Sequence, residues 1–205
     1  MLVNGVPGAW RKKMGQGRLL AIFSMGLILS PTALRGENRA IDAGHSSLKV
    51  RVFKTGVFSA FAHDHEIEAP IGEGSVDPSA NTVTLRIDAR KLRVADPETS
   101  LDTRAEIQRT MDGPMVLDVE HFADIAFAST GIEPSGDDHW RVRGGLSLHG
   151  KTAPVIVDVS LKDGHYRGSA TVKQKDFGIR PVSFAGGSVK VKDEVKIEFD
   201  IVLAQ

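Results

Sequence analysis

The sequence contains no cysteine. The chain therefore has no disulfide bond, no thiol for catalysis and no cysteine for lipoprotein-type acylation. It also has no apolar run as long as the roughly 20 residues of a membrane-spanning helix. The stability of the folded protein must therefore come from its hydrophobic core and from the hydrogen bonds of its sheet.

The sequence also lacks a nucleophile elbow of the G-x-S-x-G type. Residues 44–47 hold one glycine and two serines, but they do not match that motif and they precede the first predicted strand. Scattered serine, histidine and aspartate residues do not by themselves indicate a catalytic triad. We therefore expect a protein that is not an enzyme.

Acidic residues are missing from the first 36 residues, in which a basic stretch from Arg11 to Arg18 precedes an apolar run at 19–29. This order is typical of a secretory signal peptide. The apolar run ends at Ser30-Pro31, so no stable membrane span is expected after cleavage. We predict a signal peptide at residues 1–36 and a periplasmic or otherwise extracytoplasmic mature protein.

Removal of residues 1–36 takes away 5 of the 26 basic residues and none of the 26 acidic residues. The 21 basic and 26 acidic residues that remain give the mature chain a net charge near −5. Such a chain is a poor partner for nucleic acid, whose phosphates attract basic surfaces. We expect one domain, residues 37–205, that binds no nucleic acid.

Apolar and polar residues alternate through much of the chain, most clearly between Val195 and Leu203. A period of two is typical of a β-strand with one buried face. Alternation and β-type composition predict further strands at 48–53, 83–88, 125–129, 140–148, 155–161 and 166–172. Turn-forming segments at 77–81, 134–138, 149–151 and 162–164 separate these strands.

One segment, residues 99–111, has a helical pattern, with Thr99 or Ser100 as the N-cap and Gly113-Pro114 as the stop. Many closely spaced strands with a single helix form either a sandwich or a barrel, and a closed barrel leaves no exposed sheet edge. We therefore expect an all-β barrel with one short helix, and a sandwich is the alternative.

Five segments carry a family likeness: IDAGHSS at 41–47, MVLDVEHFADIAFAS at 115–129, LSLHGKTAPV at 146–155, DFGI at 176–179 and DEV at 193–195. In this order and spacing they resemble the YceI-like family, and the likeness covers about residues 40–205. The resemblance implies an extended antiparallel eight-stranded barrel, similar to the lipocalins, around an elongated apolar cavity. It also implies binding of a polyisoprenoid or another long-chain lipid.

A barrel of this size has room for one small ligand if bulky side chains do not fill its interior. Burial of apolar area would supply the affinity. We therefore expect a long-chain apolar molecule as the partner and no other cofactor, and a homodimer is left open. The candidates for the cavity wall are aromatic: Phe53, Phe58, Phe61, Phe127, Tyr166, Phe177 and Phe184.

His63 and His65 lie at i and i+2, in a segment that departs from the plainer hairpin of the commonest family pattern. On an extended strand they share one face, which suits hydrogen bonds to a ligand headgroup or a shared metal ion. Arg180 is a further candidate for an anionic headgroup. A zinc site needs three or four protein ligands, and no certain third ligand accompanies the pair. A metal- or cofactor-binding periplasmic protein is therefore the alternative to the lipid carrier.

A third alternative is an interaction module whose barrel is filled by its own side chains. The interior distinguishes this module from a carrier, because a carrier needs an open apolar cavity. The positions expected to face the interior are Val50, Val83, Leu85, Val157, Gly168, Ala170 and Ile197.

Overall fold

Antiparallel β-strands make up most of the computed structural model, which describes residues 38–55, 64–184 and 189–205 apart from the side chains of Phe184 and Val189. The strands are β1 (Arg39–Ala40), β2 (Ser47–Thr55), β3 (His65–Glu68), β4 (Glu73–Asp77), β5 (Thr82–Asp88), β6 (Arg93–Val94), β7 (Asp124–Gly136), β8 (His139–Leu148), β9 (Lys151–Lys162), β10 (His165–Lys173), β11 (Ser183–Phe184) and β12 (Val189–Val202). The described helices are η2 (Ala89–Lys91), α1 (Leu101–Asp112) and η3 (Gln174–Phe177). The predicted all-β class with one short α-helix is confirmed for the described residues.

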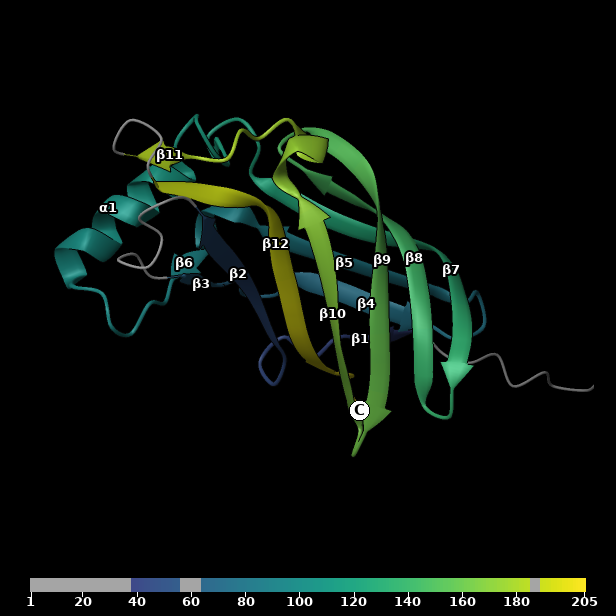
Figure 1. Ribbon diagram of the computed structural model, residues 1–205. Coiled ribbons are helices and arrows are strands. Elements are labelled where there is room, and N and C mark those ends of the chain that lie inside the picture. The colour runs from purple at the N-terminus through teal and green to yellow at the C-terminus, as the bar shows by residue number, and fades with distance from the viewer. Residues whose placement is uncertain (1–37, 56–63, 185–188) are drawn as a thin grey trace, which may run out of the picture. The chain divides into compact units, whose positions relative to one another are not determined.

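The strands form one curled sheet in the order β1-β4-β5-β7-β8-β9-β10-β12-β2-β3-β6, and β11 pairs with β12 (Figure 1). Ile41, directly after β1, bridges Leu203, directly after β12. The backbone N of Asp42 also donates to the O of Val202 at 2.8 Å. These contacts join β1 to β12 and close a ring of eight strands, from β1 through β12.

The sheet has twelve strands rather than the predicted eight, because three long strand paths are interrupted and the short β11 adds one more strand. β2 follows β1 along β12, β4 follows β3 after a short break, and η2 separates β5 from β6. The sheet has two ends that we name by their contents. The turn end contains the β4–β5 turn at 77–81, and the helix end contains α1 and β6, which lie together in Figure 1.

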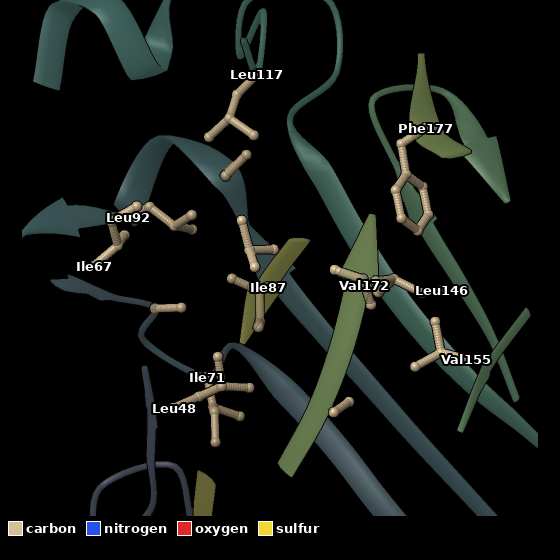
Figure 2. Packing of buried hydrophobic residues seen from close by; sticks show 14 of the residues in the cluster. Leu48, Ile67, Ile71, Ile87, Leu92, Leu117, Leu146, Val155, Val172 and Phe177 are labelled. Atoms are coloured by element: carbon tan, nitrogen blue, oxygen red, sulfur yellow. The ribbon is translucent and has the colours of Figure 1, made fainter. Parts of the chain in front are cut away.

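Apolar side chains from all around the sheet point into a common core, as the alternating pattern predicts (Figure 2). Leu48 on β2, Ile87 on β5 and Val172 on β10 are all buried, although long stretches of sequence separate them. Burial of each such side chain contributes about 1.5–3 kcal/mol relative to its exposure. The hydrophobic interior therefore holds the curled sheet together from inside.

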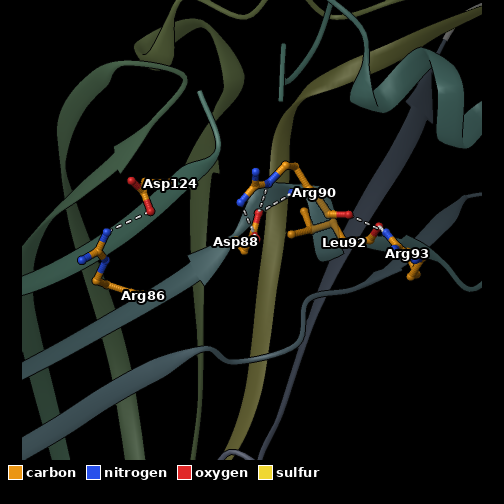
Figure 3. Close-up of polar contacts among 6 residues, drawn as sticks. All are labelled: Arg86, Asp88, Arg90, Leu92, Arg93 and Asp124. Atoms are coloured by element: carbon orange, nitrogen blue, oxygen red, sulfur yellow. Dashed lines mark hydrogen bonds and ion pairs between the residues drawn. The ribbon is translucent and has the colours of Figure 1, made fainter. Parts of the chain in front are cut away.

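Charged side chains on the outer face fix the corner between β5 and η2 (Figure 3). The Asp88 carboxylate accepts hydrogen bonds from the backbone N of Arg90 at 3.0 Å and from its Nε at 2.9 Å. The hydrogen bond from the Arg90 side chain lowers the pKa of Asp88. Beyond η2, Arg93 Nη1 donates to the O of Leu92 at 2.7 Å. These bonds set the turn that leaves the Leu92 side chain buried.

Helix α1 begins at the predicted cap, where the Ser100 side chain accepts a hydrogen bond from the N of Thr103 at 3.2 Å. The Gln108 side chain ties the helix to β6, because its Oε1 accepts from the N of Val94 at 2.9 Å and its Nε2 donates to the O of Leu92 at 3.0 Å. No helix in the described ranges has the length and apolarity to cross a membrane.

The sheet divides between β9 and β10 at the helix end. Pairing of these strands covers only His165–Ser169 with Asp158–Lys162, although both strands continue beyond it. η3 contacts β9, β10 and β12, and its Phe177 is the largest fully buried side chain of the described residues. Gly178 follows η3 with φ +78°, a conformation that glycine adopts without strain. η3 therefore covers the division, with the Phe177 side chain packed into the core.

Candidate ligand-binding cavity

An apolar cavity of about 450 Å³ runs through the described interior of the sheet. Its volume lies within the range of roughly 300–1,000 Å³ that is usual for ligand pockets. The wall at the turn end includes Trp140 and Tyr166, and the wall at the helix end includes Leu92, Leu148 and Ile179. The cavity therefore extends along the strands rather than across them.

The interior positions predicted from alternation line this cavity, with one exception. Those that line it are Val50, Val83, Leu85, Val157, Ala170 and Ile197. Gly168 is the exception, because the Phe199 ring occupies the space beside it. A Cβ on Gly168 would lie 2.5 Å from Phe199 Cζ and 2.3 Å from the O of Asp158. The small residue thus makes room for an aromatic ring of the wall.

Two of the predicted aromatic residues, Phe127 and Tyr166, lie in the cavity wall. Phe127 on β7 packs over Gly144 of the neighbouring β8, where a Cβ would lie 2.4 Å from Phe127 Cζ. Tyr166 on β10 lies beside Trp140 on β8, with ring centroids 6.4 Å apart. The glycine lets the Phe127 ring lie close to the sheet instead of filling the cavity.

The cavity wall does not include Phe53 or Phe177, although both were predicted for it. Phe53 follows Val52, which faces the cavity, so alternation along β2 turns Phe53 to the other face. There Lys192 Nζ lies 5.7 Å from its ring centroid. Phe177 is only 1% exposed and packs into the core from η3, because it no longer belongs to the β10 strand. For these two residues the predicted place in the wall was wrong.

The other predicted site residues lie elsewhere. Phe58, Phe61 and His63 fall outside the described residues, and only the backbone of Phe184, on β11, is described. Arg180 is exposed and is not part of the cavity wall. Its contact with a headgroup stays a prediction.

His65 lies at the helix end, on the face of β3 that also carries the cavity-lining Ile67. Its Nδ1 lies 2.5 Å from Asp96 Oδ2, and Asp96 Oδ1 accepts from the N of Glu66 at 2.7 Å. The His65 side chain is 18% exposed and that of Asp96 is 5% exposed. Burial lowers the pKa of the nearby Lys54, and the charges of Asp64 and Asp96 oppose that shift. The helix end of the cavity is therefore bordered by a partly buried ionisable cluster.

The described residues contain no group of three or more histidine, cysteine, aspartate or glutamate side chains that could hold a metal ion. Two further histidines, His45 and His121, are each paired with a different aspartate. His45 Nδ1 lies 2.8 Å from Asp42 Oδ2, and His121 Nδ1 lies 2.9 Å from Asp118 Oδ1. The hydrogen bond that the His121 side chain donates to the Asp118 carboxylate raises the pKa of His121. A metal site that uses His63 stays a prediction.

Polar groups occur in the cavity wall at both of its ends. At the turn end, Asp77 and Asn81 line it from the β4–β5 turn, where Asp77 Oδ1 accepts from the N of Ser79 and of Ala80, each at 2.9 Å. At the helix end, Gln174 lines it directly after β10. Between these ends the wall is apolar, which suits a long ligand with few polar atoms.

Comparison with known proteins identifies the family of this fold. The family model of the YceI-like domain matches residues 40–203. The chain belongs to the YceI-like family.

Relatives of this YceI-like protein include a UPF0312 protein of Vibrio cholerae, 25% identical over 196 residues, which cover 88% of this chain and 96% of that one. A UPF0312 protein of Shewanella putrefaciens is 26% identical over 166 residues, which cover 75% of this chain and 82% of that one. The crystal structure of Burkholderia cenocepacia BcnA is similar with a TM-score of 0.55 at 19% identity, and the match covers 80% of this chain and 99% of that one. The structural likeness confirms the fold.

Sequence reasoning missed Asp96 and Gln174 in this YceI-like protein. Asp96 precedes a proline in a segment without periodicity, so nothing in the sequence indicated that it is buried beside His65. The sequence did indicate an inward position for Gln174, because this residue continues the alternation of Ala170 and Val172 on β10. A polar side chain was not expected to face an apolar interior, so the alternation was not extended to it.

Proposed function

We propose that this YceI-like protein is an exported, non-catalytic carrier that holds one long apolar molecule, such as a polyisoprenoid or a quinone-like lipid, in its barrel cavity. The observation that carries the proposal is the continuous apolar wall between the turn end and the helix end. The family membership supports it as well. The ligand would be bound mainly by burial of its chain, since the wall offers polar groups only near its ends.

The energetics of burial favour a long chain. Each methylene removed from water contributes about 0.8 kcal/mol, so ten methylenes contribute roughly 8 kcal/mol before the entropy of ordering the chain is subtracted. Ionisable side chains in the described cavity wall are limited to Asp77 and Tyr166, at the turn end. General acid–base catalysis along the apolar part of the wall therefore has no side chain to perform it. This composition supports a binding role.

The carrier function is tested by identifying what the protein holds. The full chain is expressed with its N-terminal segment, purified, extracted with organic solvent and examined by mass spectrometry. The extracted protein is then titrated with a fluorescent long-chain lipid, and unlabelled polyisoprenoid is added as competitor. We expect a co-purified lipid and displacement of the fluorescent lipid. Absence of both would overturn the proposal.

Export is tested separately. We expect the protein recovered from outside the cytoplasm to lack residues 1–36, which the sequence predicts to be a signal peptide. The intact mass of the recovered protein locates the cleavage site. A full-length protein that stays in the cytoplasm would contradict the export part of the proposal and leave lipid binding unaffected.

A further inference from the structure

Gln174 is a buried polar side chain in an otherwise apolar part of the cavity wall. It is 9% exposed, and the described side chains that are both polar and buried are Gln174 and Asp96. The lining residues from the same part of the wall are Val172, Ile179 and Val195. A polar group in such surroundings is stable only when its hydrogen bonds are made.

The backbone of β12 fixes how the Gln174 amide is oriented. Nε2 donates to the O of Lys192 at 2.7 Å, at an irregularity in the β12 pairing between Val191 and Val195. Because a carbonyl oxygen only accepts, the atom of the amide that faces Lys192 must be the nitrogen. Close by, the N of Lys175 donates to Asp193 Oδ1 at 3.0 Å and fastens η3 to the same part of β12. The amide is therefore held in one orientation.

The Oε1 of Gln174 has no hydrogen-bond donor among the described residues, since Nε2 makes the one hydrogen bond of this side chain. The described side-chain atoms that are fully buried without a partner do not include Oε1, so this oxygen remains accessible. Gln174 lines the cavity, so a molecule in the cavity can reach it. Water or a ligand group that reaches the cavity can supply the donor. The ligand group that does so must carry an O–H or N–H.

We propose that Gln174 makes the cavity selective for a long-chain molecule that carries a hydroxyl group, such as a prenyl alcohol or a phenol. This inference rests on the proposed carrier function and specifies its ligand. A hydroxyl donates to Oε1 and can also accept from the second hydrogen of Nε2. An ether, a hydrocarbon or a quinone carbonyl has no hydrogen to donate. The hydroxyl then lies at the helix end, and the chain extends toward Trp140 and Tyr166.

The test compares an alcohol with its own methyl ether, so that the two ligands differ in the donated hydrogen. Geranylgeraniol and geranylgeranyl methyl ether are used to displace a fluorescent lipid from the full chain. We expect the unaltered protein to bind the alcohol about tenfold more tightly than the ether, in line with one buried hydrogen bond. We expect Gln174→Met to weaken binding of the alcohol about tenfold and to change binding of the ether by less than about twofold.

The matched control is Val157→Ala, which removes apolar contact from the cavity wall. It should lower the affinity for the alcohol and for the ether by the same factor. Circular dichroism checks that Gln174→Met folds, because this change also removes the hydrogen bond to Lys192. The comparison within the unaltered protein needs no variant. Equal affinities for alcohol and ether in that protein, or equal losses in Gln174→Met, would overturn the inference. If neither ligand binds, the proposed carrier function is contradicted, and so is the inference that rests on it.

Discussion

The imidazole of His65 and the carboxylate of Asp96 form a side-chain pair between β3 and the segment that leads into α1, with Nδ1 2.5 Å from Oδ2. Arg104 of α1 reinforces this connection, because its Nη2 donates to the O of Asp96 at 2.7 Å. Asp96 therefore links three parts of the chain at the helix end of the cavity. Its carboxylate is almost completely buried, so its hydrogen bonds are made away from water.

We expect Asp96→Ala to lower the free energy of unfolding by about 2–4 kcal/mol. The change leaves the N of Glu66 and the Nδ1 of His65 without their acceptor in a partly buried site. Urea denaturation measures the effect. Asp42→Ala is the control, because the Asp42 carboxylate makes a similar contact with His45 in an exposed turn, where water screens the contact, and this change should destabilise the protein much less. Similar losses in both variants would contradict the role of burial.

Gly144→Ala should destabilise the protein by about 1–3 kcal/mol. The new methyl group would lie 2.4 Å from Phe127 Cζ and 2.6 Å from the O of Ala128, so ring and backbone must shift. Gly131→Ala, on the facing strand β7, is the matched control, since no atom lies within 4 Å of its Cβ position. Thermal unfolding distinguishes the two variants. An equal shift in melting temperature would mean that the Phe127 ring does not need the space.

Val157→Trp and Ile156→Trp place the same large side chain on opposite faces of β9. Val157 lines the cavity, whereas Ile156 is 54% exposed. We expect Val157→Trp to reduce the affinity for a fluorescent lipid at least about tenfold, because the ring takes up ligand volume. Ile156→Trp should bind the lipid like the unaltered protein. Unchanged binding by Val157→Trp would show that the lipid does not occupy this cavity.

Acid should weaken the fold partly through Asp200. Burial alone would raise the pKa of this carboxyl, but hydrogen bonds from Arg167 and His165 outweigh it and lower the pKa below its ordinary value. A lowered folded pKa stabilises the protein fully above the unfolded pKa of about 3.9, and this stabilisation is lost as the pH falls through the folded value. We expect urea midpoints to decline between about pH 5 and pH 2, and less steeply in Asp200→Asn. Identical slopes would exclude a contribution from Asp200.

The long strands followed from the sequence because their alternation is sustained. The alternate residues Val195, Ile197, Phe199, Ile201 and Leu203 line the cavity or belong to the core, as predicted. The short strands β3, β4 and β6 were not predicted, because two to five residues carry too little periodicity. β7 was predicted to end at Ser129, but it continues to Gly136 and pairs through Pro134 by means of bulges. The proline and glycine of this segment resembled a turn.

The candidate site was harder to predict than the fold, because a list of aromatic residues does not show which face they take. The alternation that predicted β2 already turned Phe53 away from the cavity. Phe177 lies beyond the end of β10, where the period of two no longer applies. The contact of His65 with Asp96 depends on tertiary structure, since 31 positions separate the two residues.

The bridge between Ile41 and Leu203 has a consequence for when the protein can fold. The first strand of the ring finds its partner at the end of β12, so a chain that has not yet been made as far as β12 cannot close the sheet. Pairing over such a separation in sequence is also intrinsically slow. A nascent chain with this topology therefore stays open until β12 has been made.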